Sequence, residues 1–220
     1  MASGSGAAEL LGRLAAGLDA AGVPYMLTGS FASTLFGAPR TTQDIDIVID
    51  PSLGSLEKLL RCFPEDAYYV SRDAAREAYG TEGTFDLVDF ASGWKIDFIM
   101  RKRGPFGEEE FRRRRLVEVL GARFFVATAE DVIVAKLEWA KFGESERRLR
   151  DVAGMLRGQQ GELDLNYIRH WVEALKLGAQ WEAACARVGL LGFHVRSGHS
   201  ATPSLPLAPR LSPCGTLLAG

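Results

Sequence analysis

Two carboxylates stand two residues apart inside an isoleucine-rich segment, Asp44 and Asp46 in the stretch QDIDIVID. Side chains alternate along a β-strand, so both carboxylates project from one face while the isoleucines take the other. Their Cα atoms then lie ~6–7 Å apart, and like charges that close repel unless a cation lies between them. Because ionised carboxylates are costly to desolvate, the pattern predicts a partner, which is water, an arginine or a metal ion.

A third carboxylate, Asp97, occupies a polar position in the alternating segment WKIDFIM. If that segment forms a strand beside the first, Asp97 joins Asp44 and Asp46. Three carboxylates on adjacent strands form an oxygen-rich pocket suited to Mg²⁺, which prefers hard ligands together with waters and phosphates. The simpler alternative is a set of solvent-facing acids on an exposed sheet face, and for Asp97 alone that interpretation is favoured.

A Gly-Ser pair, Gly29 and Ser30, stands where an apolar segment passes into a short amphipathic one. Gly permits close backbone approach, and the amides at the start of the following helix, with the Ser30 hydroxyl, would make a small anion cradle. We expect Ser30 to be the N-cap of this helix and Gly37 to end it. Thirteen residues separate Ser30 from Asp44, enough for one short helix and a return along the neighbouring strand. A phosphate cradle and the acids would then lie side by side.

These residues require a sheet with helices around it, and the hydrophobic pattern predicts an α/β fold built on a mixed β-sheet. Expected strands cover 23–29, 43–50, 67–72, 84–90 and 94–100, the last two joined as a hairpin. Expected helices cover 8–21, 30–37, 51–63 and 73–80. The segment 116–127 is either two short strands or one extended region broken at Gly121.

From Thr128 the pattern becomes purely helical, with Thr128 as the expected cap and Asp131 three residues on. Helices are expected over 131–142, 145–157, 164–175 and 180–188. The predicted organisation is a catalytic core over 1–127, a helical appendage completing the site over 128–188, and a tail over 189–220. The tail is rich in Gly, Ser and Pro and lacks acidic residues, so we expect it to be disordered.

Composition indicates an ordinary globular protein. The 220 residues are 47% hydrophobic and 25% charged, and the net charge of −2 gives no overall attraction to nucleic acid or anionic membranes. Three cysteines without a CxxC pair argue against a disulfide framework. With neither a signal peptide nor an apolar run of ~20 residues, we expect a cytoplasmic protein. The run Arg112–Arg115 could contact an RNA backbone, although a solvated surface is favoured.

The segments LTGSFAS, TTQDIDIVID and WKIDFIM, in that order, resemble the signature of the nucleotidyltransferase superfamily that shares its fold with DNA polymerase beta. The later segments AEDVIVAKLEWAKF and RRLRDVAGML are similar to elements of the AbiEii/AbiGii toxin-like nucleotidyltransferases. The resemblance covers about residues 20–185 and leaves the tail unmatched.

The resemblance implies that Asp44 and Asp46 bind Mg²⁺ on the triphosphate of a nucleoside triphosphate (NTP). It implies that Asp97 completes a second metal site and helps to activate the acceptor hydroxyl. Gly29 and Ser30 would hold the β- and γ-phosphates.

The resemblance also extends to four further residues. Lys136 would reach the triphosphate, and Asp151 matches a further acid of the helical motif. Arg40 and Thr42 would have a positioning role. Read without the resemblance, Lys136 is a lysine among apolar neighbours that extends to water.

The implied function is Mg²⁺-dependent transfer of a nucleoside monophosphate (NMP) from NTP to an acceptor hydroxyl. The acceptor is a tRNA end, as in toxin–antitoxin toxins with an antitoxin partner, or a small hydroxylated molecule. The alternative is a non-catalytic nucleotide-binding or partner-binding protein on the same fold. A metal-dependent sugar transferase with an Asp-x-Asp motif is disfavoured, since it usually needs a longer chain.

Overall fold

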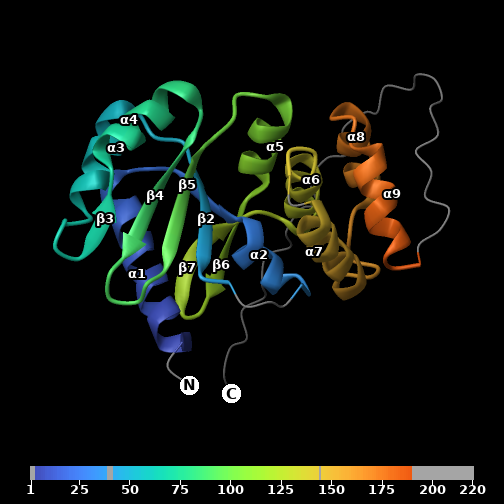
Figure 1. Cartoon of the computed structure of the whole chain (residues 1–220), viewed down its shortest axis with the longest axis horizontal. Coiled ribbons are helices and arrows are strands. Elements are labelled where there is room, and N and C mark those ends of the chain that lie inside the picture. The colour runs from blue at the N-terminus through green and yellow to red at the C-terminus, as the bar shows by residue number, and fades with distance from the viewer. Residues whose placement is uncertain (1–2, 39–41, 144, 190–220) are drawn as a thin grey trace, which may run out of the picture.

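The computed structural model describes residues 3–38, 42–143 and 145–189. Within these ranges seven strands form one mixed sheet in the order β3-β4-β5-β2-β1-β7-β6 (Figure 1). The strands are β1 Tyr25–Thr28, β2 Asp44–Ile49, β3 Tyr68–Val70, β4 Thr84–Asp89, β5 Lys95–Met100, β6 Arg115–Val119 and β7 Ala122–Val126. The predicted α/β class and mixed sheet are confirmed.

The helices of the described residues surround this sheet. They are α1 Ser3–Ala21, α2 Gly29–Leu35, α3 Leu53–Arg61, α4 Arg72–Thr81, α5 Pro105–Arg113, α6 Ala129–Trp139, α7 Ser145–Gly158, α8 Leu165–Ala174 and α9 Gly178–Ala186. None of them is both long enough and apolar enough to cross a membrane.

Strands β2 and β5 lie side by side and parallel at the centre of the sheet. Along both strands buried apolar residues alternate with partly exposed polar ones, as the period of two predicts. The apolar face packs under α1 and α3: the Phe63 ring, just after α3, lies 6.3 Å from the ring of Phe98 on β5. The carboxylate-bearing positions of β2 and β5 therefore face away from these helices.

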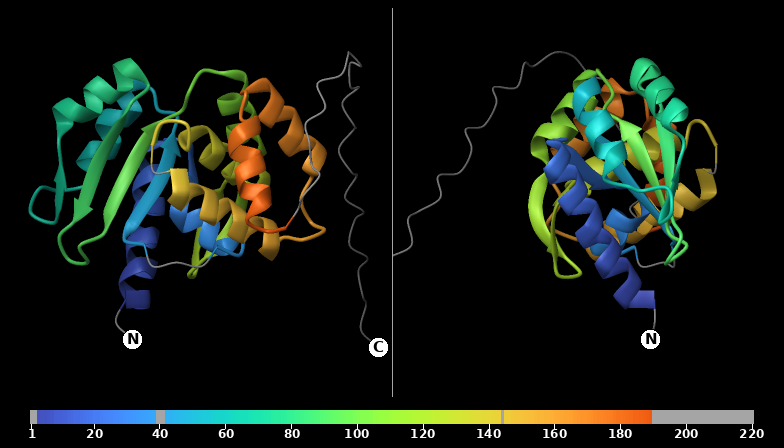
Figure 2. Two further views of the ribbon diagram at one scale, coloured as in Figure 1. Left: turned by 45° about the vertical axis from the view of Figure 1, so that its right-hand side comes forward. Right: turned by 90° about the vertical axis from the view of Figure 1, so that its left-hand side faces the viewer.

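The other face carries α2, which contacts β1 and β2 as well as α6 and α7. Figures 1 and 2 show α6–α9 grouped at one side of the sheet, next to α2 and α5. The four predicted C-terminal helices are all present, and the Thr128 side chain accepts a hydrogen bond from the Asp131 amide as the predicted cap. Buried residues of α6, such as Val132, belong to the same core as the sheet. The division at residue 127 stays a prediction, and the predicted tail lies outside the described residues apart from Gly189.

The start of α2, helix α5 and the β6–β7 hairpin were not predicted in full from the sequence. Helix α2 begins at Gly29 with Thr28 as N-cap and no side-chain cap bond, so the prediction of Ser30 as N-cap is wrong. Helix α5 was not predicted; it begins with Pro105 in its first turn, a position where the missing amide hydrogen costs nothing. The segment around Gly121 is a hairpin of β6 and β7.

Candidate active site

One register row crosses four neighbouring strands with polar side chains at every position. Thr28 of β1 pairs with Asp46, Asp46 with Asp97, and Asp97 with Asp86 of β4. Residues that face each other across paired strands share a face of the sheet, with strands about 4.8 Å apart. The row therefore sets three carboxylates side by side. Asp44 lies on the same face, two residues before Asp46 on β2.

Asp86 was not predicted as a site residue. Its signal was present in the sequence, because Asp86 takes the polar position between buried Phe85 and Leu87 in the alternating segment TFDLVD. Only the pairing of β4 with β5, which no single strand reveals, places this residue opposite Asp97.

The turn between β1 and α2 lies directly against Asp46. Gly29 has a φ of +66°, and a Cβ atom there would come within 2.6 Å of the Asp46 Cβ and closer still to its carboxylate. The Ser30 amide donates a hydrogen bond of 3.2 Å to Oδ2 of Asp46. Gly29 is thus required both by the left-handed backbone and by the close approach. In this structure the Ser30 amide is directed at a carboxylate of the row.

The pKa of Asp97 is raised above its ordinary value. Burial raises its pKa to about 6; Lys95 opposes that shift, while Asp86 and Asp46 add to it. The Lys95 ammonium lies 2.8 Å from Oδ1 of Asp97 and 3.3 Å from Oδ2 of Asp86. The contact with Asp97 lacks hydrogen-bond geometry, so it is an ion pair. Lys95 thus lies between the two carboxylates of β4 and β5.

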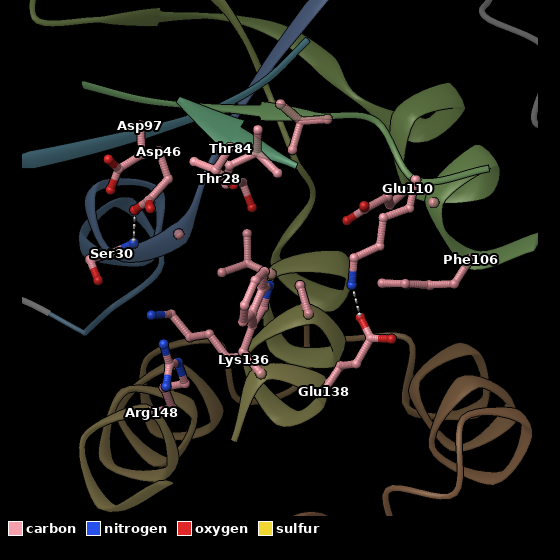
Figure 3. Close-up of a pocket in the computed structure, with 18 of the residues that line it drawn as sticks. Thr28, Ser30, Asp46, Thr84, Asp97, Phe106, Glu110, Lys136, Glu138 and Arg148 are labelled. Atoms are coloured by element: carbon pink, nitrogen blue, oxygen red, sulfur yellow. Dashed lines mark hydrogen bonds and ion pairs between the residues drawn. The ribbon is translucent and has the colours of Figure 1, made fainter. Parts of the chain in front are cut away.

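A cavity of about 460 Å³ opens over the row, and Figure 3 shows Asp46 and Asp97 on one wall with Lys136 and Arg148 across from them. Most of the predicted site residues line it: Gly29, Ser30, Asp44, Asp46, Asp97, Lys136 and Asp151. Thr42 does not; its hydroxyl accepts a hydrogen bond from the Asp44 amide at the start of β2. Arg40 lies outside the described residues.

Lys136 and Asp151 join α6 to α7 beside the cavity. Their charged atoms are 2.8 Å apart, and both side chains are buried. Lys136 therefore does not extend into open solvent. Arg147 and Arg148 of α7 line the same cavity and were not predicted; the basic stretch ERRLR was their signal. This wall brings positive charge to the side opposite the carboxylates.

The far part of the cavity is built by α5 and α6. Lys102 lies there 3.1 Å from Glu138 and 5.1 Å from the centre of the Trp139 ring. Burial raises the pKa of Glu110 to about 8, helped by Asp131 and Glu138. This part combines aromatic surface with carboxylates and lies away from the β2–β5 row.

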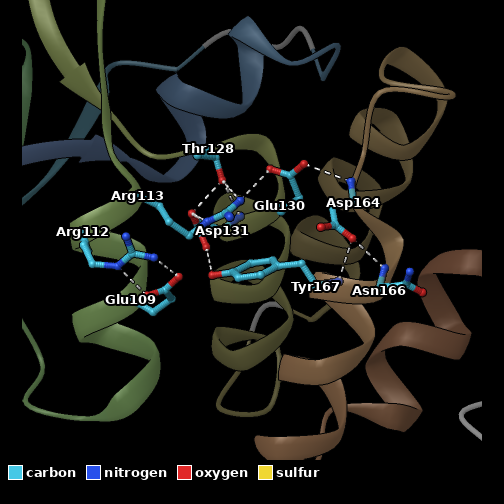
Figure 4. A network of polar contacts seen from close by, with 9 residues as sticks. All are labelled: Glu109, Arg112, Arg113, Thr128, Glu130, Asp131, Asp164, Asn166 and Tyr167. Carbon is cyan, nitrogen blue, oxygen red and sulfur yellow. Dashed lines mark hydrogen bonds and ion pairs between the residues drawn. The ribbon is translucent and has the colours of Figure 1, made fainter. Parts of the chain in front are cut away.

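Helix α5 is fixed in place by a polar network around the fully buried Asp131 (Figure 4). Asp131 accepts hydrogen bonds from Arg113 (3.1 Å), Thr128 (2.7 Å) and the Tyr167 hydroxyl. The Arg113 guanidinium also lies 3.9 Å from the centre of the Tyr167 ring. The network ties α5, α6 and α8 together and so holds the far wall of the cavity.

The arginine run of the sequence is divided among several environments. Arg112 pairs with Glu109, Arg113 enters the network, and Arg114 stacks over Phe111. Adjacent arginines at the end of a helix cannot share one face. Arg112, Arg113 and Arg114 therefore do not form a single basic surface, and contact of the run with RNA stays a prediction.

The Mg²⁺ site that the resemblance implies would use the carboxylates of this row. Among the residues that the structure describes, no three His, Cys, Asp or Glu side chains are grouped as a metal site in the metal-free protein, and the three-acid site of Asp44, Asp46 and Asp97 stays a prediction. Asp46 and Asp97 nevertheless suit Mg²⁺, because Asp97 is partly buried and repelled by Asp46. Mg²⁺ commonly binds one or two carboxylates together with waters and substrate phosphates. The pair fits one such ion; a two-metal arrangement stays a prediction.

Comparison with known proteins identifies the fold. No family model matches the chain, and no curated protein matches it by sequence. A crystal structure of ANT(2'')-Ia in complex with adenylyl-2''-tobramycin is similar at a TM-score of 0.55 and 12% identity, over 77% of this chain and 96% of that one. A solution structure of the antibiotic-resistance factor ANT(2'')-Ia gives 0.51 and 12%, over 84% and 97%.

A third similar structure is an antigenic nucleotidyltransferase-like protein from Paracoccidioides brasiliensis, with a TM-score of 0.48 and 16% identity over 80% of this chain and 92% of that one. The likeness to the two ANT(2'')-Ia structures, at 12% identity and TM-scores of 0.55 and 0.51, establishes a shared fold. The chain has the nucleotidyltransferase fold that its motifs predicted. The toxin-like branch stays a prediction.

Proposed function

We propose that the chain is a Mg²⁺-dependent nucleotidyltransferase that moves NMP from NTP to a hydroxyl group of a small acceptor. One observation carries the proposal: Asp46 and Asp97 face each other in register beside the Gly29–Ser30 turn, at the wall of a cavity lined opposite by Lys136. The carboxylates, the Gly-Ser turn and the lysine that the nucleotidyltransferase resemblance implies thus surround one cavity.

The chain's own residues would divide the work by position. Asp46 and Asp97 would hold Mg²⁺, which would supply positive charge to the triphosphate and to the leaving pyrophosphate. Lys136 contributes fixed positive charge where the triphosphate accumulates negative charge. Gly29 lets the backbone approach the phosphates without an intervening side chain.

Asp97 would help to activate the acceptor hydroxyl from its place in the pair. In the metal-free protein, burial and the neighbouring acids raise its pKa to about 6, and a bound cation would favour its ionised form. Asp44 flanks the pair and lines the cavity. Asp151 pairs with Lys136 and orients its ammonium group.

A small acceptor is favoured over a tRNA end by the cavity. Its volume of about 460 Å³ falls within the ~300–1,000 Å³ range of small-molecule sites. Its far wall carries Phe106, Glu138 and Trp139. The structurally similar ANT(2'')-Ia was solved with adenylyl-2''-tobramycin, a nucleotide joined to a small molecule. The tRNA acceptor and an antitoxin partner stay as alternatives from the sequence resemblance.

The test is incubation with each α-labelled NTP and Mg²⁺, with either a panel of small hydroxylated compounds or total tRNA. We expect label on a small product, with release of pyrophosphate, and its loss in Asp46→Asn. Label on RNA would replace the small acceptor by a tRNA end. NTP binding without turnover on either panel would support the non-catalytic alternative.

A further inference from the structure

Lys95 places its ammonium group between two carboxylates of the row. It lies 2.8 Å from Oδ1 of Asp97 and 3.3 Å from Oδ2 of Asp86. Lys95 and Asp97 are two residues apart on β5 and so share a face, while Asp86 is the register partner of Asp97 on β4. The ammonium group therefore contacts the same carboxylate that would hold the metal ion.

An ammonium group and a divalent cation at one carboxylate repel each other. A metal ion that uses Oδ1 of Asp97 requires Lys95 to leave that oxygen. Asp86 offers Lys95 a second carboxylate within reach, so the lysine can move without losing its charge partner. Lys95 is 42% exposed, so the lysine has room to move and the ion pair is weak enough to open. Oδ1 of Asp97 is buried in the metal-free protein, and departure of Lys95 would uncover it.

We propose that Lys95 and Asp86 form a latch that sets the metal affinity of the Asp46–Asp97 pair. In the metal-free protein Lys95 neutralises Asp97 and limits repulsion along the row. When a metal ion binds, Lys95 transfers to Asp86. This inference rests on the proposed function, because it concerns the same metal-binding pair.

The latch makes two predictions of opposite sign. Lys95→Met removes the competitor, so we expect Mn²⁺ to bind about twofold to fivefold more tightly. Asp86→Asn leaves Asp97 as the nearest carboxylate for Lys95, so we expect Mn²⁺ to bind about twofold to fivefold more weakly.

A general effect of charge would give the same signs, and a double-mutant cycle separates the two explanations. Asp86 acts through Lys95 in the latch, so Asp86→Asn should have little effect when Lys95→Met is already present. A purely electrostatic effect of Asp86 would lower the affinity equally in both backgrounds.

The experiment is calorimetric titration of the full chain with Mn²⁺ alone, without nucleotide. The proteins are the wild type, Lys95→Met, Asp86→Asn, the double variant and Asp46→Asn, each checked by thermal melting. Lys58→Met is the matched control, because Lys58 is exposed on α3, which packs on the other face of the sheet. It should leave the affinity unchanged.

Tighter binding in Lys95→Met together with a non-additive cycle supports the latch. If wild type binds Mn²⁺ through Asp46 but Lys95→Met does not change the affinity, or if the cycle is additive, the latch is wrong and the metal site stands. If neither wild type nor Lys95→Met binds Mn²⁺, the proposed metal-dependent function fails and the latch fails with it.

Discussion

Replacing Gly29 with alanine tests how closely the β1–α2 turn approaches the carboxylate row. The backbone there has a φ of +66°, and the new Cβ would overlap the Asp46 side chain. Relief of the overlap requires Asp46 to move, which breaks the 3.2 Å hydrogen bond from the Ser30 amide. We therefore expect both a less stable protein and a displaced carboxylate.

The loss has two parts that can be separated. A left-handed backbone costs an alanine about 1–2 kcal/mol, and loss of a hydrogen bond to a charged group costs about 1.5–3 kcal/mol. Gly29→Ala should then lower the free energy of unfolding by about 3–5 kcal/mol, equivalent to a fall in Tm of roughly 10 °C for a chain of this size.

Gly22→Ala is the matched control for thermal and urea unfolding. Gly22 has a φ of +65°, yet a Cβ there would meet nothing within 4 Å, so its substitution carries the backbone cost alone. The additional loss in Gly29→Ala should disappear when Asp46 is also replaced by glycine. Equal destabilisation by Gly29→Ala and Gly22→Ala would refute the close approach of Gly29 to Asp46.

Two further predictions concern the cavity walls. Burial raises the pKa of Glu110 from its usual 4.5 to about 8, so the native state keeps a proton that the unfolded chain has lost, and stability should fall as pH rises between these values. Urea unfolding across this range should show that Glu110→Gln removes the decline in stability. Glu109→Gln is the control: Arg112 lowers the pKa of Glu109, so this variant should keep the decline. Lys136→Met removes the ion pair of 2.8 Å with the buried Asp151 and should lower the free energy of unfolding by up to about 3–5 kcal/mol. Adding Asp151→Asn should recover part of that loss, and no recovery would contradict a mutual pairing.

Much of the sheet was predictable because its strands keep a clean period of two. Ile45 and Ile47 against Asp44 and Asp46 fixed which side chains share a face, and the structure has that alternation. The helices after Thr128 were predictable for the same kind of reason, since their apolar residues follow a helical period and the Thr128 cap is local.

The rest depended on contacts between distant segments. The position of Asp86 opposite Asp97 follows from strand order, which periodicity does not encode. Helix α5 lacks a clear apolar repeat and is held by Arg113 reaching Asp131 on another helix. The local pattern indicates Ser30 as a helix cap and Gly29 as a site of close backbone approach. It does not show that the helix begins at Gly29 or that the Ser30 amide is directed at Asp46 on another strand.

The central claim is that Asp46 and Asp97 hold a divalent cation on a nucleoside triphosphate, and NTP affinity measured with and without Mg²⁺ tests it most directly. Wild type should bind NTP more tightly when Mg²⁺ is added, and Asp46→Asn should lose that gain without a lower Tm, because removing one charge of the row relieves repulsion. Asp73→Asn, on an exposed carboxylate of α4, should keep the gain. An Mg²⁺-dependent gain that survives in Asp46→Asn, or a sharp fall in the Tm of that variant without metal, would contradict the account.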